Sequence, residues 1–413
     1  MIIAMKSQIG LLLVCSLAAC EPPPGTAQIW QQTSAPTTNW FAIASSADGT
    51  KLVAAVNEYP YDYGSSGPLY VSTNSGATWD SSSAPVTNWI GIASSANGRT
   101  LAGVTAAPLY GYPGGPIYIS TNFGAVWMPG DAPATNWVSV TCSADGSILA
   151  AAQAGAGRYA ANGSIFVSTN SGANWLSSTS PYVSWSSIAS SADGLTFIAA
   201  SSNFSQSISI STNSGASWAG TSAPWGEWES IASSAAGNAL VAVSRYDGIY
   251  VSTNAGVDWK KTSVPSYAGS WYGARIASSA DGTTLAASTH TVYLTTNSGA
   301  TWFDTSAPYT NWAALCLSAD GCRLAAGMQY GGIYTRQITP HPVLAINPSG
   351  NQIAISWLVP SVNLVLQQNP DLSTTNWTDV TAKPSLNYTN LNYELTLPAG
   401  PGAMFYRLAA KGQ

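Results

Sequence analysis

The sequence predicts an all-β protein whose main body is a seven-bladed β-propeller closed by an N-terminal strand and followed by a small β-sandwich. Three observations support this fold class. An octapeptide of the type Ser-Thr-Asn-Ser-Gly-Ala-Thr-Trp occurs six times. A segment of the type Trp-…-Ile-Ala-Ser-Ser-Ala-Asp-Gly occurs seven times. The piece missing from the last repeat lies at the other end of the array, which favours a closed ring over an open solenoid.

The composition is that of a turn-rich, globular β protein. Of the 413 residues, 46% are hydrophobic and only 8% are charged, while Gly, Pro, Trp and Tyr are abundant. The aromatic residues supply the apolar area that a chain so rich in turn residues needs for a core. With 13 Lys and Arg spread along the chain and a net charge of −5, no basic patch forms, and nucleic acid is a poor partner. We expect a monomer.

The first twenty residues resemble the signal peptide of a bacterial lipoprotein. Lys6 precedes an apolar run, Ile9 to Leu17, that is too short to span a bilayer. The segment Leu17-Ala18-Ala19-Cys20 is similar to a lipobox, which implies that Cys20 is lipidated; an ordinary signal peptide is the alternative. Residues 21–27 then act as a short tether. The resemblance implies a lipid-anchored protein of the bacterial cell envelope, periplasmic or surface-exposed, that contacts the membrane through its anchor.

The octapeptides set the period of the repeat. Their steps of 48, 48, 43, 41 and 43 residues suit a four-stranded propeller blade. In the first blade, strand A is expected at residues 41–45, strand B at residues 51–56 and strand C at residues 69–72. Strand D begins at the Trp of the octapeptide. The octapeptide Asn residues are Asn74, Asn122, Asn170, Asn213, Asn254 and Asn297.

The second signature contains the turn between strands A and B. Asp-Gly dipeptides provide the positive φ angles of a tight hairpin. The seven turns are Asp48-Gly49, Asn97-Gly98, Asp145-Gly146, Asp193-Gly194, Ala236-Gly237, Asp281-Gly282 and Asp320-Gly321. Seven strand A–B hairpins but six octapeptides leave one blade without strand D. Residues 29–36 match residues 78–85 and complete the seventh blade, so the propeller comprises residues 28–338.

The octapeptide resembles the Asp-box, Ser-x-Asp-x-Gly-x-x-Trp, of sialidases, sortilin-type receptors, the photosystem II assembly factor and xyloglucan-cleaving enzymes. Here Asn replaces the usual Asp in every copy. The side-chain oxygen of either residue accepts backbone N–H groups of the turn, so the structural role survives the exchange. The resemblance implies a folding element rather than a catalytic one.

The tail differs from the repeats. Residues 339–342 form a linker, and residues 343–413 contain about six segments with period-two alternation, which predicts a small antiparallel sandwich. The pattern is similar to fibronectin-III-like modules of secreted bacterial proteins, and this resemblance implies no ligand.

Function is expected on the propeller face that carries the D–A and B–C loops, because these loops differ from blade to blade. Their Tyr-rich segments make Tyr59, Tyr61, Tyr112 and Tyr159 ligand-binding candidates. The Trp residues that begin strand A enter from the same face and either contribute to binding or fill the gaps between blades. Flat aromatic groups with few charges suit a glycan or an envelope or surface protein.

One cluster of charged residues is predicted on this face in blades five and six. It contains Glu227, Glu229 and Asp247 as low-ranking catalytic candidates, and its candidates for ligand binding are Arg245, Tyr246, Tyr272 and Arg275, with His290 nearby. Paired carboxylates beside Arg suit glycosidic acid–base work, binding of a polar ligand, or simple pairing with one another. The rival hypothesis is therefore a polysaccharide hydrolase or lyase, and an envelope assembly factor is a third.

Other chemistry is disfavoured. Seven Arg residues without an Arg-Ile-Pro-like motif do not supply the arginine triad of a sialidase. Neither His290 nor His341 has metal-ligand spacing, so no metal and no cofactor are expected. Cys316 and Cys322 flank the seventh hairpin and are disulfide candidates. We therefore expect a non-catalytic recognition or scaffold protein, although enzymatic activity stays open.

Overall fold

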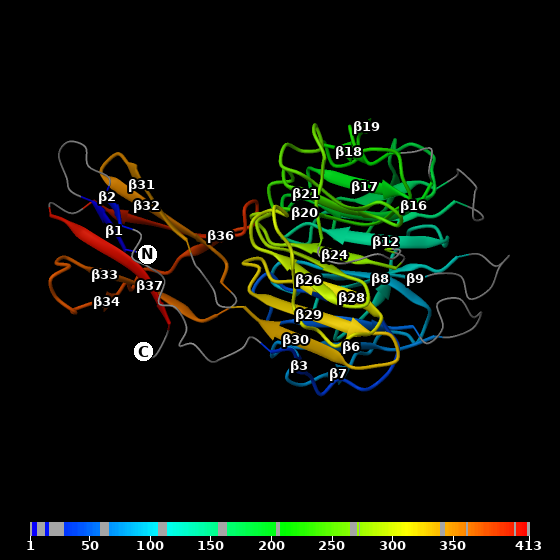
Figure 1. The fold of residues 1–413 in the computed structure, drawn as a ribbon, viewed down its shortest axis with the longest axis horizontal. Helices are drawn as coiled ribbons and strands as arrows, with labels where there is room; N and C mark the ends of the chain where they lie inside the picture. Colours follow the sequence, from blue (N-terminus) through cyan, green and yellow to red (C-terminus); the bar gives the residue numbers. More distant parts are fainter. Residues whose placement is uncertain are drawn as a thin grey trace.

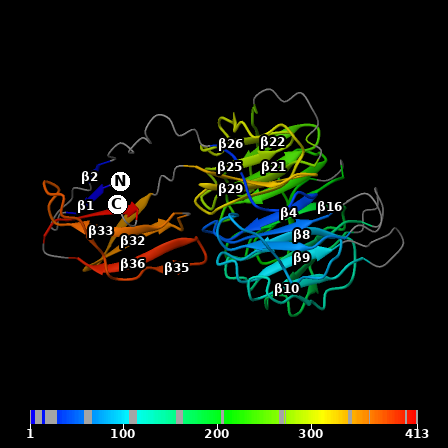
Figure 2. The ribbon, with the colours of Figure 1, turned by 90° about the horizontal axis from the view of Figure 1, so that it is seen from below.

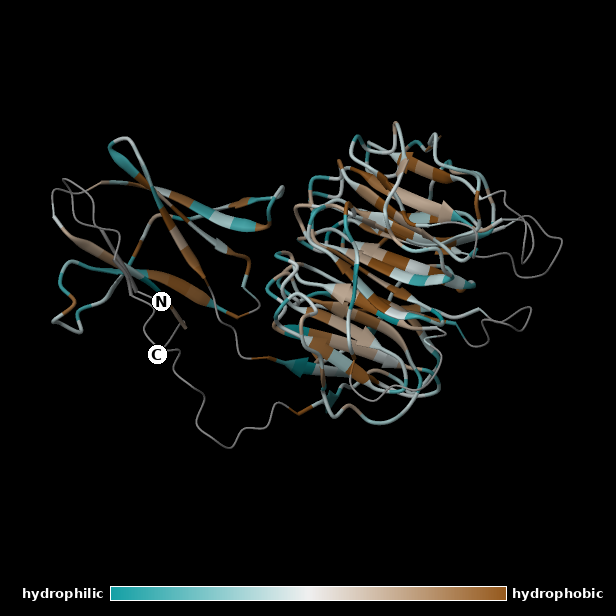
Figure 3. Ribbon diagram, turned by 45° about the horizontal axis from the view of Figure 1, so that its top comes forward, coloured by the Kyte–Doolittle hydropathy of each residue, from teal (hydrophilic) through white to brown (hydrophobic). Residues whose placement is uncertain are grey.

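The chain forms two β-structured parts that lie side by side, as Figures 1 and 2 show. The computed structural model describes residues 2–5, 13–15, 29–57, 66–105, 114–155, 163–203, 207–264, 271, 273–338, 343–360, 362–399 and 402–410. No helix in these ranges is long and apolar enough to cross a membrane. Figure 3 shows the apolar residues concentrated on the strands of both parts, with polar residues on many of the connecting turns.

The larger part is a seven-bladed β-propeller, as predicted. Each blade is an antiparallel sheet of four strands, and the seven innermost strands contact one another around the central axis. The inner strands are β4 (Trp40–Ser45), β8 (Trp89–Ser94), β12 (Trp137–Cys142), β16 (Trp185–Ser190), β20 (Trp228–Ser233), β24 (Arg275–Ser278) and β28 (Trp312–Leu317). The second strands are β5 (Leu52–Val56), β9 (Leu101–Thr105), β13 (Leu149–Gln153), β17 (Phe197–Ser201), β21 (Leu240–Ser244), β25 (Leu285–Ser288) and β29 (Arg323–Met328).

The outer half of each blade is shorter. The third strands are β6 (Leu69–Ser72), β10 (Ile117–Ser120), β14 (Ile165–Ser168), β18 (Ser209–Ser211), β22 (Gly248–Ser252), β26 (Val292–Thr295) and β30 (Ile333–Gln337). The outermost strands are β7 (Asp80–Ser81), β11 (Met128–Pro129), β15 (Leu176–Ser177), β19 (Ala219–Gly220), β23 (Lys260–Lys261), β27 (Phe303–Asp304) and β3 (Gln31–Gln32). Second strands are almost wholly buried because blades cover them on both sides, which explains their continuous Val, Leu and Ala composition.

The N-terminal strand closes the ring. β3 pairs with β30 in the seventh blade, with Gln31 opposite Thr335 and Gln32 opposite Tyr334. Trp30 anchors the strand: its ring stacks on Trp312 at 5.7 Å, and its indole N–H donates to Thr305 Oγ1 at 3.0 Å. The join between the chain ends that the sequence predicts is confirmed.

The octapeptides form identical turns in six blades. In the first, Asn74 Oδ1 accepts the N–H of Thr78 at 2.9 Å, and Ser72 Oγ accepts the N–H of Gly76 at 2.9 Å. The residue after each Asn has a left-handed φ of 53–61° although it is not glycine, and the next residue is a Gly with a φ of 81–87°. The Asn oxygen therefore holds a strained turn in place, as expected of an Asx residue.

The A–B turns meet around the axis and form a closed ring of hydrogen bonds. One alanine of each turn donates its N–H to the carbonyl of its counterpart in the next blade at 2.7–2.8 Å, and the seventh bond, from Ala319 to Ala47, closes the circle. The ring residues are Ala47, Ala96, Ala144, Ala192, Ala235, Ala280 and Ala319. We call the face that carries these turns and the octapeptides the turn face, and the opposite face, with the D–A and B–C connections, the loop face.

The tail packs two sheets around Leu344, Ile355, Trp357 and Tyr406. One sheet has the order β31 (Leu344–Ser349), β32 (Gln352–Leu358), β36 (Asn392–Pro398) and β35 (Ser385–Asn387). The other has the order β2 (Leu13–Cys15), β1 (Ile2–Met5), β37 (Met404–Ala410), β33 (Leu364–Asn369) and β34 (Thr378–Asp379). The sandwich is confirmed. Three of its strands were not anticipated: β35 in the first sheet, and β1 and β2, which lie in the expected signal peptide and extend the second sheet.

The tail covers the centre of the turn face. Val359, which is 3% exposed, packs in one apolar cluster with six of the ring alanines, and Leu358, Leu386, Leu391 and Tyr393 border the same cluster. Alanine suits the ring because a larger side chain would meet its neighbours near the axis. The tail therefore seals the central channel at this end.

The predicted disulfide between Cys316 and Cys322 is not formed, and this prediction is wrong. Cys316 in β28 pairs with Ala325, three residues beyond Cys322. Three residues along a strand separate the two Cα positions by about 10 Å, more than the roughly 7 Å that a disulfide spans. Both thiols are buried, and that of Cys322 donates to the carbonyl of Asp320 at 3.3 Å. Burial raises the pKa of the Cys316 thiol to about 12.

Candidate functional site

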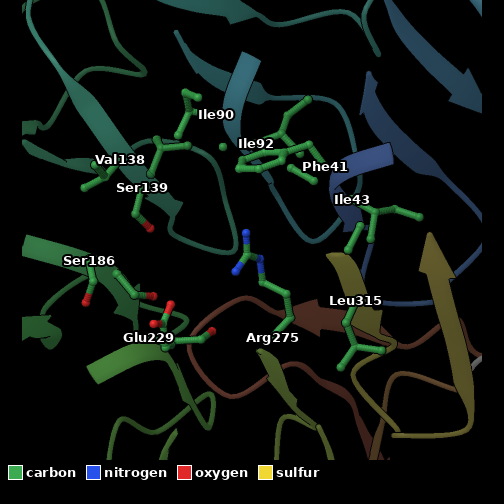
Figure 4. Close-up of a pocket in the computed structure, with 16 residues that line it drawn as sticks. Phe41, Ile43, Ile90, Ile92, Val138, Ser139, Ser186, Glu229, Arg275 and Leu315 are labelled. Carbon is green, nitrogen blue, oxygen red and sulfur yellow. The ribbon is translucent and has the colours of Figure 1, made fainter. Parts of the chain in front are cut away.

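The central channel opens toward the loop face as a cavity of about 300 Å³. The beginnings of all seven inner strands line it, mostly with Ser, Gly, Ala, Ile and Val (Figure 4). Three larger or charged side chains interrupt this lining: Phe41, Glu229 and Arg275. The cavity is therefore a small chamber of neutral character with one positive and one negative group in its wall.

Arg275 occupies its place because blade six begins differently. In the other six blades a β-bulge follows the strand A Trp, and the next paired residue is small. In blade six Trp271 lies farther from the strand, and Arg275 takes that position opposite Ser288. Its guanidinium lies toward the cavity in Figure 4, 5.5 Å from the ring centre of Phe41.

The backbone fixes the direction of the Arg275 side chain. Its Nη1 donates to the carbonyls of Gly273 at 3.2 Å and Ala274 at 3.3 Å. A guanidinium held in this way against an aromatic face presents a planar set of donors that suits a polar or anionic group. Arg275, predicted from sequence as a binding candidate, is thus placed in the channel wall.

Arg245 holds both neighbouring glutamates. Its guanidinium contacts Glu227 at 2.9 Å and Glu229 at 2.5 Å, and all three side chains are largely but not fully buried, at 14–25% exposure. Burial by itself lowers the pKa of Arg245, but the hydrogen bond and charge of Glu229 outweigh it and raise that pKa. One cation between two carboxylates makes a structural bridge between the first two strands of blade five, not a pair of carboxyl groups poised for acid–base chemistry.

Asp247 is also engaged, but with different partners. It accepts hydrogen bonds from the Lys261 ammonium and the Tyr250 hydroxyl. The Lys261 hydrogen bond, followed by that of Tyr250, holds the pKa of Asp247 below its ordinary value. Burial, together with the carboxylate of Asp247, raises the pKa of Tyr250 to about 12. Asp247 is therefore an ionised partner of Lys261, about half exposed, and not a carboxylic acid able to donate a proton.

The remaining sequence candidates divide between two groups. Tyr246 is 63% exposed beside the Arg245 guanidinium, 5.9 Å away, and His290 stacks on Tyr309 at 5.5 Å. Tyr59, Tyr61, Tyr112, Tyr159 and Tyr272 lie outside the described residues. No group of three or more His, Cys, Asp or Glu side chains able to hold a metal lies within the part of the chain that the structure describes.

The strand A Trp residues are wedges between blades and do not line a binding surface. Trp40, Trp89, Trp137, Trp185, Trp228 and Trp312 are at most 2% exposed, and Trp271 is 5% exposed. Six of the seven contact an aromatic residue of strand C in their own blade; Trp40, for example, meets Tyr70 at 5.5 Å between ring centres. Trp185 instead contacts Trp218 at 6.3 Å. Of the two interpretations that the sequence allowed, gap filling is correct.

Sequence reasoning missed the exposed aromatic residues of the D–A loops. Tyr182, Trp225 and Tyr309 are 68%, 77% and 82% exposed on the loop face. The signal that finds them is a comparison of the repeats position by position: each directly follows the Pro that ends a Ser-Ala-Pro-like segment. Phe41 was also missed because no comparison of equivalent positions was made: it directly follows the strand A Trp, and the residue type at this position differs from blade to blade.

The comparisons show the fold. No family model matches the chain, and no curated protein matches it. Among solved structures, it is similar to a GH74 xyloglucanase from Xanthomonas campestris at 14% identity, with a TM-score of 0.57, covering 80% of this chain and 59% of that one. It is also similar to YCF48 from Cyanidioschyzon merolae at 15% identity, with a TM-score of 0.53, covering 75% and 98%. YCF48 bound to D1 peptide gives 14% identity and a TM-score of 0.49, covering 76% and 98%.

The xyloglucanase and YCF48 from Cyanidioschyzon merolae have a fold like that of this propeller. At identities of 14–15% the similarity shows the fold of this chain and does not indicate its function. The chain spans about three-fifths of the xyloglucanase chain.

Proposed function

We propose that this protein is a non-catalytic recognition protein that holds its ligand on the loop face, over the mouth of the central channel. The observation that carries this proposal is the state of its charged groups. Glu227 and Glu229 are both held by Arg245, and Asp247 is held by Lys261 and Tyr250. A hydrolase needs one carboxyl group that gives up a proton and another that acts as a base or nucleophile. These three carboxylates are instead engaged as ion-pair partners.

The shape of the channel supports binding. Since the tail covers the turn face around Val359, a ligand reaches the chamber from the loop face only. Small side chains leave room there, and Arg275 and Phe41 offer a positive charge and an aromatic face. The wall of the chamber is more polar than apolar, because several Ser side chains line it beside Glu229 and Arg275. A concave site with convergent hydrogen-bonding groups suits recognition of a polar ligand.

Binding and turnover are tested together with the purified protein. Isothermal titration against neutral and acidic polysaccharides and against solubilised envelope proteins should find a ligand whose affinity falls in Arg275→Ala. Release of reducing ends or unsaturated sugars should stay at background. Turnover that disappears in Glu227→Gln or Asp247→Asn, with the unfolding curve unchanged, would establish the enzymatic alternative instead.

The same proposal includes export and anchoring. We infer that residues 1–19 are removed and that Cys20, the first residue of the mature chain, carries the lipid. We also infer that the octapeptides are Asp-box turns and that the tail is a fibronectin-III-like module. β1 and β2 pair at the edge of β37, so cleavage would leave β37 as the edge of its sheet. Incorporation of labelled palmitate that is lost in Cys20→Ser tests the anchor, and unlabelled wild-type protein would contradict it.

A further inference from the structure

One position of the repeat faces solvent wherever the structure describes it. It is the residue after the Pro in the D–A loop, where the chain passes from the outer strand of one blade to the inner strand of the next. The described residues at this position are Thr37, Val86, Ala134, Tyr182, Trp225 and Tyr309, and all six are exposed. A residue here is thus not selected by packing, and an aromatic ring here has no role in the core.

The aromatic residues occur in only part of the ring. Thr37, Val86 and Ala134 precede blades one to three, whereas Tyr182, Trp225 and Tyr309 precede blades four, five and seven. Tyr246 of blade five and Tyr330 of blade seven, 63% and 67% exposed, extend the same side of the loop face. We call Tyr182, Trp225, Tyr246, Tyr309 and Tyr330 the aromatic platform.

Neighbouring contacts hold parts of the platform in fixed positions. The Tyr309 ring stacks on His290 at 5.5 Å with an interplanar angle of 18°, and the N–H of Thr310 donates to the His290 carbonyl at 2.8 Å. The loops that carry Trp225 and Tyr246 are held together by their neighbours Glu227 and Arg245. These two residues form an ion pair, and the N–H of Arg245 donates to the carbonyl of Glu227 at 2.8 Å. Rings that are exposed and already oriented lose little entropy on contact with a ligand.

The chemistry around the rings favours a sugar over a protein. The rings come from loops of several blades and are separated by Ser, Thr, Asn, Gly and Pro. Their charged neighbours are paired, as Arg245 is with Glu227 and Glu229 and Lys261 is with Asp247. A protein interface needs a continuous desolvated centre. A pyranose has an apolar C–H face for a flat ring and neutral hydroxyl groups for Ser and Asn side chains.

We infer that the aromatic platform binds a neutral polysaccharide laid across blades four to seven of the loop face. The inference rests on the proposed function and names its ligand class. Because the rings span several blades, the ligand is a chain of several sugars. Because stacking and neutral hydrogen bonds carry the contact, binding should change little with salt.

Affinity electrophoresis tests the inference with galactomannan, glucomannan, mixed-linkage β-glucan and soluble starch as neutral probes and with alginate and polygalacturonate as acidic ones. The variants Tyr182→Thr, Trp225→Thr and Tyr309→Thr install the residue that the first loop carries at Thr37. Phe123→Ser is the matched control, since Phe123 is 41% exposed in an octapeptide turn whose counterparts contain Ser or Ala.

At least one neutral probe should retard the wild-type protein equally at low and high salt. Affinity should fall about three- to tenfold for each ring removed, the range of one aromatic stacking contact, and stay unchanged in Phe123→Ser.

Three results would overturn the inference while leaving the proposed function intact. The first is that the variant carrying all three substitutions, Tyr182→Thr, Trp225→Thr and Tyr309→Thr, is retarded as strongly as the wild-type protein. The others are salt-sensitive binding of acidic probes alone and binding of envelope protein alone. Absence of any ligand for the wild-type protein, or release of reducing ends from a probe, would overturn the proposed function as well. The urea unfolding curve of each variant separates loss of binding from loss of folding.

Discussion

The two faces of the propeller are built from the same repeats but differ in how much the repeats vary. On the turn face, seven alanines form a closed hydrogen-bonded ring and six octapeptides adopt one conformation. On the loop face, one loop position alone carries Thr, Val, Ala, Tyr, Trp and Tyr. The uniform positions hold backbone hydrogen bonds of the ring or of their own turn, whereas this varied position is exposed to solvent.

The difference teaches where to search for function in a repeat protein. Residues that make the repeat recognisable, such as Asn74 and its five counterparts, satisfy backbone groups of their own turn. The tail then covers the centre of this face through Val359. The departures from the repeat, Arg275 and Trp225 among them, are found on the opposite face, where we propose that recognition occurs. Five variants probe this contrast, in order of decreasing effect.

Trp228→Ala should have the largest effect, although Trp228 begins its strand on the loop face. The side chain is 1% exposed and contacts Tyr250 at 5.5 Å and Trp259 at 6.4 Å. Loss of a buried Trp costs about 3–5 kcal/mol of unfolding free energy. Urea unfolding followed by far-UV circular dichroism measures it. A loss below 1 kcal/mol would mean that the wedges between blades contribute little, contrary to their burial.

Val359→Asp should detach the tail from the turn face. Val359 lies among the ring alanines, and a carboxylate there would be buried without a partner. The buried Val alone contributes about 1.5–3 kcal/mol. Val343→Asp is the matched control, because Val343 is 67% exposed in the same tail. Hydrogen exchange should rise at the A–B turns in Val359→Asp only; equal protection in both variants would show that the tail does not seal the channel.

Ser211→Ala tests a single octapeptide turn. The Ser211 hydroxyl donates to Asn213 Oδ1 at 3.0 Å and accepts the buried N–H of Gly215 at 2.9 Å. Removing it leaves that N–H without its acceptor, which costs about 1–3 kcal/mol. Thr37→Ala on the loop face, where the side chain is exposed, should stay within about 0.5 kcal/mol of wild type. Equal losses in the two variants would remove the distinction between the faces.

The sequence predicts the propeller well because its repeats are constrained by packing. Blade number, the closure by residues 29–36 and the full or partial burial of the octapeptide Trp residues follow from side chains that recur at fixed spacing. The ring of alanines was visible in the Ala-Asp-Gly turns, but not its hydrogen bonds, since they join residues about 45 positions apart in different blades. The docking of Val359 is a contact between unrelated segments, for which no periodicity exists.

The candidate site was predicted only in part, for a related reason. Glu227, Glu229 and Arg245 were correctly grouped, but their pairing depends on side-chain distances that spacing does not determine. Arg275 reaches the channel only because blade six lacks the bulge of its neighbours. The Cys316–Cys322 prediction was wrong because proximity in sequence was taken for proximity in the hairpin, whereas the strand register separates them.

Acid should lower the unfolding free energy of the propeller by protonating aspartates of the turn face. Burial acts to raise the pKa of Asp48, but hydrogen bonds from Ser46 and Thr50 and the charge of Lys51 outweigh it, so this pKa lies below the ordinary 3.8. Asp145 behaves alike, with burial opposed by hydrogen bonds from Ser143 and Ser147. A depressed folded-state pKa contributes stability that is present above the unfolded-state value and is lost as pH falls through the folded-state value.

In the double variant Asp48→Asn/Asp145→Asn this contribution is absent. The stability difference from wild type should be constant above about pH 5 and should shrink below it. Urea midpoints between pH 7 and the lowest pH at which the protein stays folded measure the trend. A difference that grows on acidification would contradict the lowered pKa values of the two aspartates.

Trp225→Thr should have the smallest effect on stability, although it removes the same side chain as the first variant, three residues away. Trp225 is 77% exposed and makes no contribution to the core, so the unfolding free energy should change by less than about 0.5 kcal/mol. A substitution neutral for folding and costly for polysaccharide binding is what separates a recognition residue from a core residue. If Trp225→Thr instead destabilises the protein as Trp228→Ala does, the loop face is part of the scaffold, and its variation reflects packing between particular blades.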